Sequence, residues 1–196
     1  MVKPGRKRDP DAERRILDAT RDLIAAQGSK KVTINDIATE ANVGKQTIYR
    51  WWPTKPALVL DALEREIKSA NPPPATGSTY EDLRMQMQRV AAMFASPTGS
   101  IIREMIAESL NDDDIAEQFR ERFFLERLKR GMPTFEAGVA SGALRADLDL
   151  DVVSEMLYAP LWLRLIVGHR PLTPAVVDTI LDHAWPILST EPHPTD

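Results

Sequence analysis

Apolar residues recur every three or four positions along most of the chain, which is the spacing expected on one face of an α-helix. The repeat is clearest over residues 11–27, where Ile16, Leu23 and Ile24 fall on one face and Gly28 ends the pattern. We find no stretch of strand length in which apolar and polar residues alternate. The sequence therefore predicts an all-α protein of about nine to ten helices.

Residues 28–67 are predicted to form three further short helices. Thr33, followed by Asp36 three positions later, is typical of a residue that caps the start of a helix. That helix ends near Asn42, a residue type that tolerates the left-handed backbone of a tight turn. The next helix begins at Lys45, and a fourth follows it. Two short helices joined by a turn of about three residues form a helix-turn-helix pattern.

A connector rich in proline, at residues 71–78, separates two predicted domains. We expect residues 1–70 to form the helix-turn-helix domain, with residues 1–10 as a basic, flexible arm. Residues 71–196 are expected to form a second helical domain. Its predicted helices cover residues 79–95, 100–110, 113–130, 133–141, 150–168 and 174–188.

Charge is distributed unevenly, although the chain as a whole carries only −4. Residues 1–55 hold twelve Lys or Arg against seven Asp or Glu, a net charge of +5, so the remainder carries −9. A basic N-terminal region on an acidic body favours binding to a polyanion such as nucleic acid. An arm of Lys3, Arg6, Lys7 and Arg8 is suited to a DNA minor groove, with a solvated tail as the alternative.

Composition excludes several other functions. With no cysteine, the chain has no thiol catalysis, disulfide framework or thiolate metal site, and it suits the reducing cytoplasm. No signal-peptide core follows the basic start, and the most apolar stretch, residues 156–167, is about half of what a bilayer requires. Asp147, Asp149 and Asp151 lack the glycine and glutamate of a calcium loop. We expect no metal, no cofactor and no membrane association, and no motif predicts an enzyme.

The polar start of the Lys45 helix indicates how the motif would read DNA. An α-helix fits the major groove, and side chains on its first turn meet base edges. There Lys45 can donate to guanine, Gln46 can pair with adenine, and Thr47 offers a hydroxyl and a methyl group. Tyr49 and Lys55 suit phosphate contacts. The alternative is an ordinary helical hairpin whose polar face is only solvated.

Residues 33–58 read TINDIATEANVGKQTIYRWWPTKPAL, and the wider segment 15–63 resembles the N-terminal domain of TetR-family transcriptional repressors. The resemblance implies base contacts at Lys45, Gln46 and Thr47. It implies phosphate contacts at Tyr49 and Lys55. The DNA-binding residues that it implies are Thr33, Lys45, Gln46, Thr47, Tyr49, Arg50, Trp51 and Lys55.

This sequence departs from the family pattern at two positions of the turn. Asn42 stands where the family usually has glycine, and Gly44 stands where it often has serine. Gly44 lacks a hydroxyl, which puts one expected phosphate contact in doubt. Trp52 takes the place of a buried aromatic residue and is expected in the core. The resemblance also implies that the rest of the chain is a ligand-binding and dimerisation domain.

The second domain carries aromatic and methionine residues suited to an apolar ligand. Tyr158 and Trp162 stand four residues apart and share a helical face, and Tyr158 supplies a polar group. The residues predicted to line a ligand cavity are Phe94, Met105, Phe124, Tyr158 and Trp162. Core packing explains the same residues without any ligand. Arg103 and His169 are weaker candidates for anchoring an anionic group.

The helices at 150–168 and 174–188 carry more apolar surface than one domain core can bury. We expect two copies of this pair to form a four-helix bundle, as TetR-like proteins do. The residues predicted at the interface are Met156, Pro160, Leu163, Val167, Val177, Ile180, Leu181 and Ala184. Two-fold symmetry then predicts a near-palindromic operator.

Two hypotheses from different classes follow. The first is a cytoplasmic, homodimeric transcriptional repressor that binds double-stranded operator DNA and releases it when a small apolar molecule occupies the second domain. The second is a helical DNA-binding or interaction protein controlled by a protein partner, with no small-molecule ligand. A closed, fully packed second domain favours the second hypothesis. The sequence names neither the ligand nor the operator.

Overall fold

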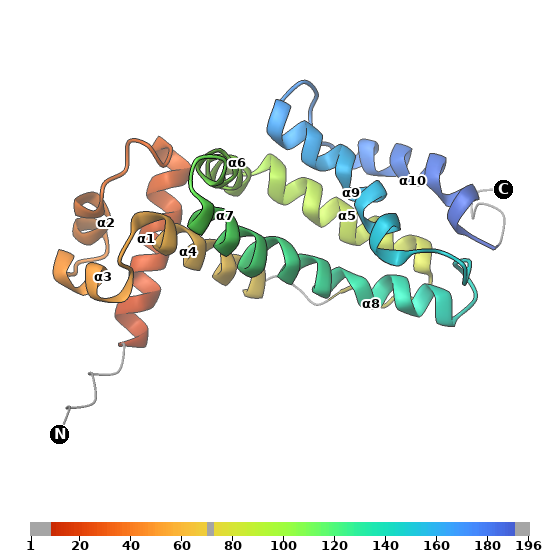
Figure 1. Cartoon of the computed structure of the whole chain (residues 1–196), viewed down its shortest axis with the longest axis horizontal. Helices are drawn as coiled ribbons and strands as arrows, with labels where there is room; N and C mark the ends of the chain where they lie inside the picture. Colours follow the sequence, from red (N-terminus) through yellow and green to blue (C-terminus); the bar gives the residue numbers. More distant parts are fainter. Residues whose placement is uncertain (1–8, 70–72, 191–196) are drawn as a thin grey trace. The chain divides into compact units, whose positions relative to one another are not determined.

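The structure is a computed structural model that describes residues 9–69 and 73–190. Within those ranges it contains ten α-helices and one π-helical turn but no strand, apart from an isolated bridge between Leu144 and Ser189 (Figure 1). The predicted all-α class is confirmed. In the same ranges, no helix combines the length and the hydrophobicity needed to cross a bilayer. The basic arm at residues 1–8 lies outside the described residues.

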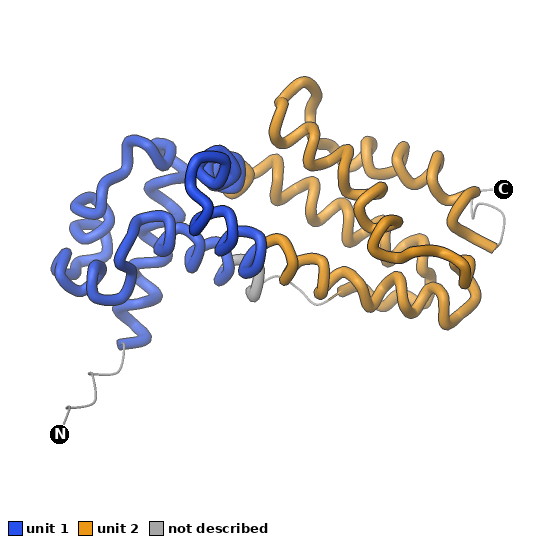
Figure 2. Tube along the Cα trace, in the orientation of Figure 1, with its two compact units in different colours: residues 1–69, 100–123 blue, residues 70–99, 124–196 orange. Residues whose placement is uncertain are grey.

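The chain divides into two compact units, which Figure 2 colours separately. The first comprises residues 1–69 and 100–123, and the second residues 70–99 and 124–196. The predicted domain boundary at residue 70 stays a prediction, and residues 100–123 pack with the N-terminal unit. There Arg122 forms ion pairs with Asp61 and Glu64, which no local sequence pattern reveals.

The first unit is a small helical core that supports the helix-turn-helix. Ile16, Ile37, Ile48 and Leu58 come from four different helices, and none of them has exposed surface. Gly28, with φ of 82°, ends the first helix in a conformation that favours glycine. The helices are α1 (Pro10–Gln27), α2 (Ile34–Glu40), α3 (Lys45–Trp51), α4 (Lys55–Ser69), α6 (Pro97–Ser109), which begins in the second unit, and α7 (Asp113–Phe119).

The second unit is built around α5, which packs against α8, α9 and α10. Tyr80 and Arg84 of α5 bind Asp182 and Asp178 of α10, at 3.1 Å and 2.8 Å. The elements are α5 (Thr79–Ala95), the π-helical turn (Arg120–Leu125), which begins in the first unit, α8 (Glu126–Ala140), α9 (Leu150–Val167) and α10 (Pro174–Leu188).

One predicted helix break is absent. The sequence suggests an interruption before Pro133, because proline removes a backbone hydrogen bond from a helix interior. In the structure α8 continues through Pro133 to Ala140. Phe135 on the same helix has no exposed surface, so the packing of α8 in the core holds the helix together across the proline.

Candidate nucleic-acid interface and ligand site

The start of α2 is fixed by a reciprocal cap between Thr33 and Asp36. The Thr33 amide donates to Asp36 Oδ2 at 2.8 Å, and the Asp36 amide donates to Thr33 Oγ1 at 3.3 Å. The Thr33 hydroxyl itself donates to Asp36 Oδ2 at 2.7 Å. These bonds hold the pKa of Asp36 below its ordinary value. The arrangement is the capping box that the sequence predicts, and it orients the exposed Thr33 side chain at the helix start.

The turn between α2 and α3 has the backbone that its sequence predicts. Asn42 has φ of 51°, the one positive φ among the described non-glycine residues. The Val43 amide donates to the Ala38 carbonyl at 3.0 Å, which closes the turn. Gly44 then caps α3 without a side chain, and a Cβ added there would meet no atom within 4 Å. An open depression between the two helices is lined by Asn35, Ala38, Thr39, Asn42, Val43, Gly44 and Lys45.

The first turn of α3 presents polar side chains to solvent above an apolar anchor. Lys45 and Gln46 are exposed, and Thr47 is half-buried. Ile48 on the opposite face has no exposed surface. Tyr49 is 51% exposed, and Arg50 is also exposed. The residues predicted to read bases are thus accessible on a helix that is held from behind.

The two tryptophans after this turn have different environments. Trp52 is 2% exposed, which confirms its predicted place in the core, and its indole Nε1 donates to Asp61 Oδ2 at 2.6 Å. Trp51 is half-buried and meets Trp52 edge to face, with ring centroids 5.7 Å apart. The Arg50 guanidinium lies 5.8 Å from the Trp51 ring centroid. Arg50 and Trp51 thus form a surface pair in the last turn of α3.

Lys55 is engaged inside the protein. Its Nζ donates to the carbonyl oxygen of Ser29, and the Ser29 amide donates to Glu104 Oε2 at 2.7 Å. Burial lowers the pKa of Lys55, an effect opposed by the charges of Glu108 and Glu104. The phosphate contact of Lys55 stays a prediction, and it would require the amine to leave the bond that ties the start of α4 to the segment after α1.

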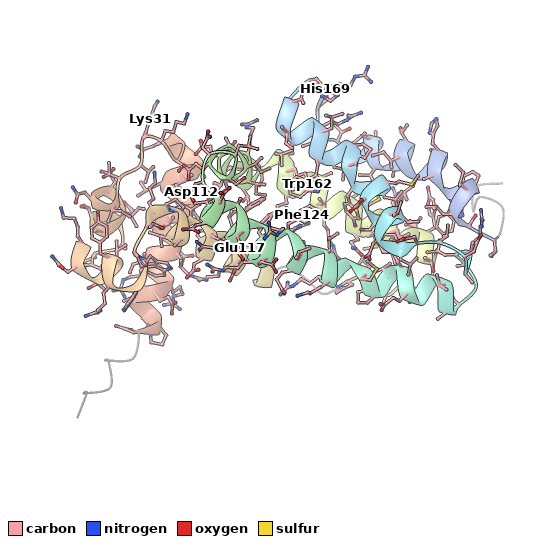
Figure 3. The ribbon with its side chains drawn as sticks, viewed as in Figure 1. Lys31, Asp112, Glu117, Phe124, Trp162 and His169 are labelled. Carbon is pink, nitrogen blue, oxygen red and sulfur yellow. The ribbon has the colours of Figure 1, made fainter. Side chains whose placement is uncertain are left out.

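The aromatic residues predicted to line a ligand cavity are largely brought together in the second unit. The Trp162 ring centroid lies 4.7 Å from that of Phe94 and 5.7 Å from that of Phe124. Figure 3 labels Trp162 and Phe124, which lie close together. Tyr158 precedes Trp162 by one turn on α9, and its hydroxyl is buried. Met105 is buried but belongs to the first unit.

Neither weaker candidate for an anionic anchor joins the aromatic group. Arg103 belongs to the first unit, where its side chain is exposed and donates to Ser100 Oγ at 3.4 Å. His169 is exposed in the loop just after α9 (Figure 3). Both side chains are exposed to solvent, and an anchoring role for either residue stays a prediction.

Two family models match the chain. One, described as "Bacterial regulatory proteins, tetR family", covers residues 16–62, and the other, "Tetracyclin repressor-like, C-terminal domain", covers residues 73–184. The chain is also 35% identical over 183 residues to the uncharacterized HTH-type transcriptional regulator YdeS of Bacillus subtilis, covering 93% of this chain and 92% of YdeS. The chain belongs to the TetR family. It is a DNA-binding transcriptional regulator.

Solved structures of TetR-family proteins have the same fold. The crystal structure of the TetR family transcription regulator SCO0332 matches with a TM-score of 0.77 and 26% identity, over 90% of this chain and 97% of that one. A transcriptional regulator from Saccharomonospora viridis, solved in complex with choline, matches with a TM-score of 0.68 and 21% identity, over 93% and 100% of the two chains. At 21% identity, the similarity to the Saccharomonospora viridis protein establishes a shared fold only.

TetR-family regulators dimerise, and α9 of this chain exposes several large apolar side chains. The exposed fractions of its large apolar side chains lie between 48% and 60%. These side chains are Val152, Met156, Leu163, Ile166 and Val167. Residues spaced by three, four and seven lie on one side of a helix, so most of them form a stripe.

On α10 the predicted dimer contacts need correction. Val177 and Leu181 have no exposed surface within a single chain, so they are unavailable to a partner. α10 presents this face to α5. Pro160 of α9, together with Ile180 and Ala184 of α10, is half-buried. Because α10 is apolar on more than one side, its sequence does not distinguish the face that packs inside the chain from a face that is available to a partner.

Sequence reasoning missed two polar residues beside the aromatic group. Arg127 of α8 donates through Nη1 to Met93 Sδ at 3.5 Å. Gln86 of α5 accepts a hydrogen bond from Thr134 Oγ1 at 2.9 Å. A signal for Arg127 is present in the sequence, because it stands three residues after Phe124 and shares that apolar side of the helix.

Proposed function

We propose that this TetR-family regulator is a cytoplasmic, homodimeric repressor of transcription. It binds a near-palindromic operator through α3 and leaves the DNA when a small, largely apolar molecule occupies the second unit. Lys45, Gln46 and Thr47 read base edges, whereas Thr33, Tyr49, Arg50 and Trp51 contact the DNA backbone.

The observation that carries this proposal is the first turn of α3. Lys45 and Gln46 are exposed there, while Ile48 and Trp52 are buried and hold the helix in place. Side chains near the start of a recognition helix meet base edges when it enters the major groove. Lysine pairs with guanine, and glutamine pairs bidentately with adenine.

The dimer arrangement follows from the exposed stripe on α9. Burying Met156, Leu163 and Val167 against a second copy removes apolar surface from water, which is the main favourable term in protein association. A two-fold axis then presents one α3 from each protomer to successive major grooves, with half-sites about 34–36 Å apart. The operator is accordingly near-palindromic.

A small-molecule effector is supported by the aromatic group around Trp162. Phe94 and Phe124 pack on that ring, and the nearby Tyr158 hydroxyl is buried. Ligand sites are mostly apolar and carry a few polar groups that fix orientation. The choline complex of the Saccharomonospora viridis protein shows a relative of this fold with a small molecule.

The proposal is tested by selecting operator sequences from a random oligonucleotide pool and measuring binding by fluorescence anisotropy. Gln46→Ala should relax preference at one base pair in each half-site by about 1–3 kcal/mol. Gln27→Ala is the matched control, because Gln27 is exposed at the end of α1. Failure to enrich any sequence, or an unchanged preference in Gln46→Ala, contradicts the proposal.

A further inference from the structure

Three helical segments of the second unit place polar side chains beside an aromatic wall. α5, the segment from the π-helical turn into α8, and α9 each contribute to it. The Trp162 ring packs on Phe94 and on Phe124, so the three rings form one apolar surface. The group of side chains, called here the Tyr158 cluster, comprises Gln86, Phe94, Phe124, Arg127, Tyr158 and Trp162.

The Tyr158 hydroxyl is the feature of this cluster that packing does not explain. Among the residues that the structure describes, it is a buried side-chain oxygen with no hydrogen-bond partner. Burial raises the pKa of Tyr158, although the charge of Arg127 and the nearby Gln86 amide oppose the shift, so the hydroxyl stays protonated at neutral pH. A buried donor without an acceptor costs free energy. A bound molecule that accepts a hydrogen bond from this hydroxyl removes the cost.

The neighbouring polar groups also offer donors. The Gln86 oxygen already accepts from Thr134, at 2.9 Å. The Gln86 amide nitrogen lies against Gly131, where an added Cβ would be only 2.6 Å from it. Arg127 donates to Met93 Sδ, a weak acceptor at 3.5 Å. A ligand atom that enters the cluster therefore meets N–H and O–H groups, and an acceptor fits it best.

The charges near Tyr158 indicate whether the bound molecule is an anion or a cation. Burial lowers the pKa of Arg127, Tyr158 opposes the shift, and the positive charge of Arg130 adds to it. Three aromatic rings alone would suit a quaternary ammonium ion through cation–π contacts. The positive charge of Arg127 acts on Tyr158, so it disfavours such a cation and favours an anion, to which a guanidinium group binds as a charged donor.

We propose that the Tyr158 cluster binds a flat, apolar monocarboxylate. Its carboxylate accepts hydrogen bonds from Tyr158 and Arg127, and its ring lies on Phe94, Phe124 and Trp162. This inference rests on the proposed function, because it names the chemical class of the effector that the repressor senses.

The test is isothermal titration calorimetry of the full-length protein with three matched probes. Phenylacetate carries the carboxylate, phenylacetamide is its neutral counterpart, and benzyltrimethylammonium is the cation. We expect phenylacetate to bind at least about tenfold more tightly than phenylacetamide, the usual scale of a charge-assisted hydrogen bond, and the cation not to bind. Equal affinity of the first two probes, preference for the cation, or no binding of phenylacetate at millimolar concentration overturns the proposal.

Variants assign the binding to these residues. Tyr158→Phe and Arg127→Gln should each weaken phenylacetate binding about tenfold, and Arg127→Lys should recover part of the loss because it keeps the charge. Arg103→Gln, which removes an exposed arginine charge from the first unit, should leave the affinity unchanged. If Arg127→Gln does not fold, Tyr158→Phe still tests the site, because it keeps the aromatic ring and removes only the hydroxyl that donates to the carboxylate. Unchanged affinity in Tyr158→Phe contradicts the assignment.

Operator binding separates this inference from the proposed function. A protein that binds a selected operator and is released by a neutral compound, but not by phenylacetate, retains the proposed function and refutes the carboxylate. A protein that selects no operator, yet binds phenylacetate through Tyr158 and Arg127, refutes the proposed function and retains the site.

Discussion

The indole nitrogen of Trp52 donates a hydrogen bond to Asp61 at 2.6 Å, across the turn that joins α3 to α4. Arg122 donates to the other carboxylate oxygen of Asp61 and, at 2.7 Å, to Glu64. The residue that caps the C-terminal end of α3 is therefore bound to a carboxylate that also holds Arg122 of the π-helical turn. All four residues lie in the first unit.

Trp52→Phe should preserve the aromatic packing and remove the hydrogen bond to Asp61. We expect the free energy of unfolding to fall by about 1–2 kcal/mol, and operator affinity to fall because the end of α3 is less well held. Trp51→Phe is the control for stability alone, since Trp51 is half-buried at the surface beside Arg50 and is itself a proposed DNA contact. Urea unfolding and fluorescence anisotropy measure both quantities. Equal stability of the wild type and Trp52→Phe would show that the bond contributes nothing.

Gly44→Ser should strengthen the start of α3. Gly44 has φ of −75°, an extended conformation that serine adopts, and a Cβ there meets open space. A serine hydroxyl can cap the helix, which stabilises it by about 0.3–0.5 kcal/mol over glycine, and can also reach a DNA phosphate. Gly44→Ala adds the Cβ without the hydroxyl. Higher operator affinity in Gly44→Ser than in Gly44→Ala confirms the phosphate contact, and equal affinities contradict it.

Lys55→Met should lower stability without changing the salt dependence of DNA binding. The variant loses the hydrogen bond to Ser29, and we expect a cost of about 1–2 kcal/mol. Lys45→Gln should instead flatten the plot of log affinity against log salt if Lys45 neutralises a phosphate as well as reading a base, by about one unit at most. Both slopes come from anisotropy titrations at several salt concentrations. A flatter slope in Lys55→Met would show that Lys55 leaves Ser29 to bind DNA.

The contrast between Asn42 and Lys55 shows how far the sequence predicts this site. Local backbone chemistry identifies the turn, because few residue types accept the φ of 51° found at Asn42. The partner of a long side chain is decided by tertiary structure. Ser29 is 26 residues from Lys55 in sequence, and Glu104 comes from a distant helix, so a lysine that suits a phosphate in the sequence is occupied in the fold.

The second unit was harder to predict for a related reason. α10 is apolar on several faces, and only the fold shows that Val177 and Leu181 pack inside the chain. The same holds for residues 100–123, which pack with the first unit and include Arg122, the ion-pair partner of Glu64. Periodicity identifies helices reliably, but it does not reveal which apolar face meets which neighbour.

The cap of α2 should make stability depend on pH in the acidic range. Hydrogen bonds from Thr33 lower the pKa of Asp36 from its ordinary 3.8, so the folded state binds this proton less readily than the unfolded state. The contribution is therefore fully present well above pH 3.8 and disappears as pH falls through the lowered pKa. Asp36→Asn should be less stable than the wild type at pH 6, and the difference should shrink below pH 4. Urea unfolding at both pH values checks this, and a difference independent of pH contradicts it.

Leu163→Glu should dissociate the dimer, because it places a charge within the exposed apolar stripe of α9. Leu163 is 54% exposed in the single chain, so the substitution leaves the core intact and the monomer folded. In the dimer the same side chain would be desolvated without a partner of opposite charge, which costs several kcal/mol. We expect sedimentation to show a dimer for the wild type and a folded monomer for Leu163→Glu, with much weaker operator binding because each half-site is then bound separately.

His169→Glu is the control, because it adds the same charge at an exposed position after the helix and should remain dimeric. A wild-type protein that sediments as a monomer at micromolar concentration refutes the α9 interface, and a dimeric Leu163→Glu places the interface elsewhere.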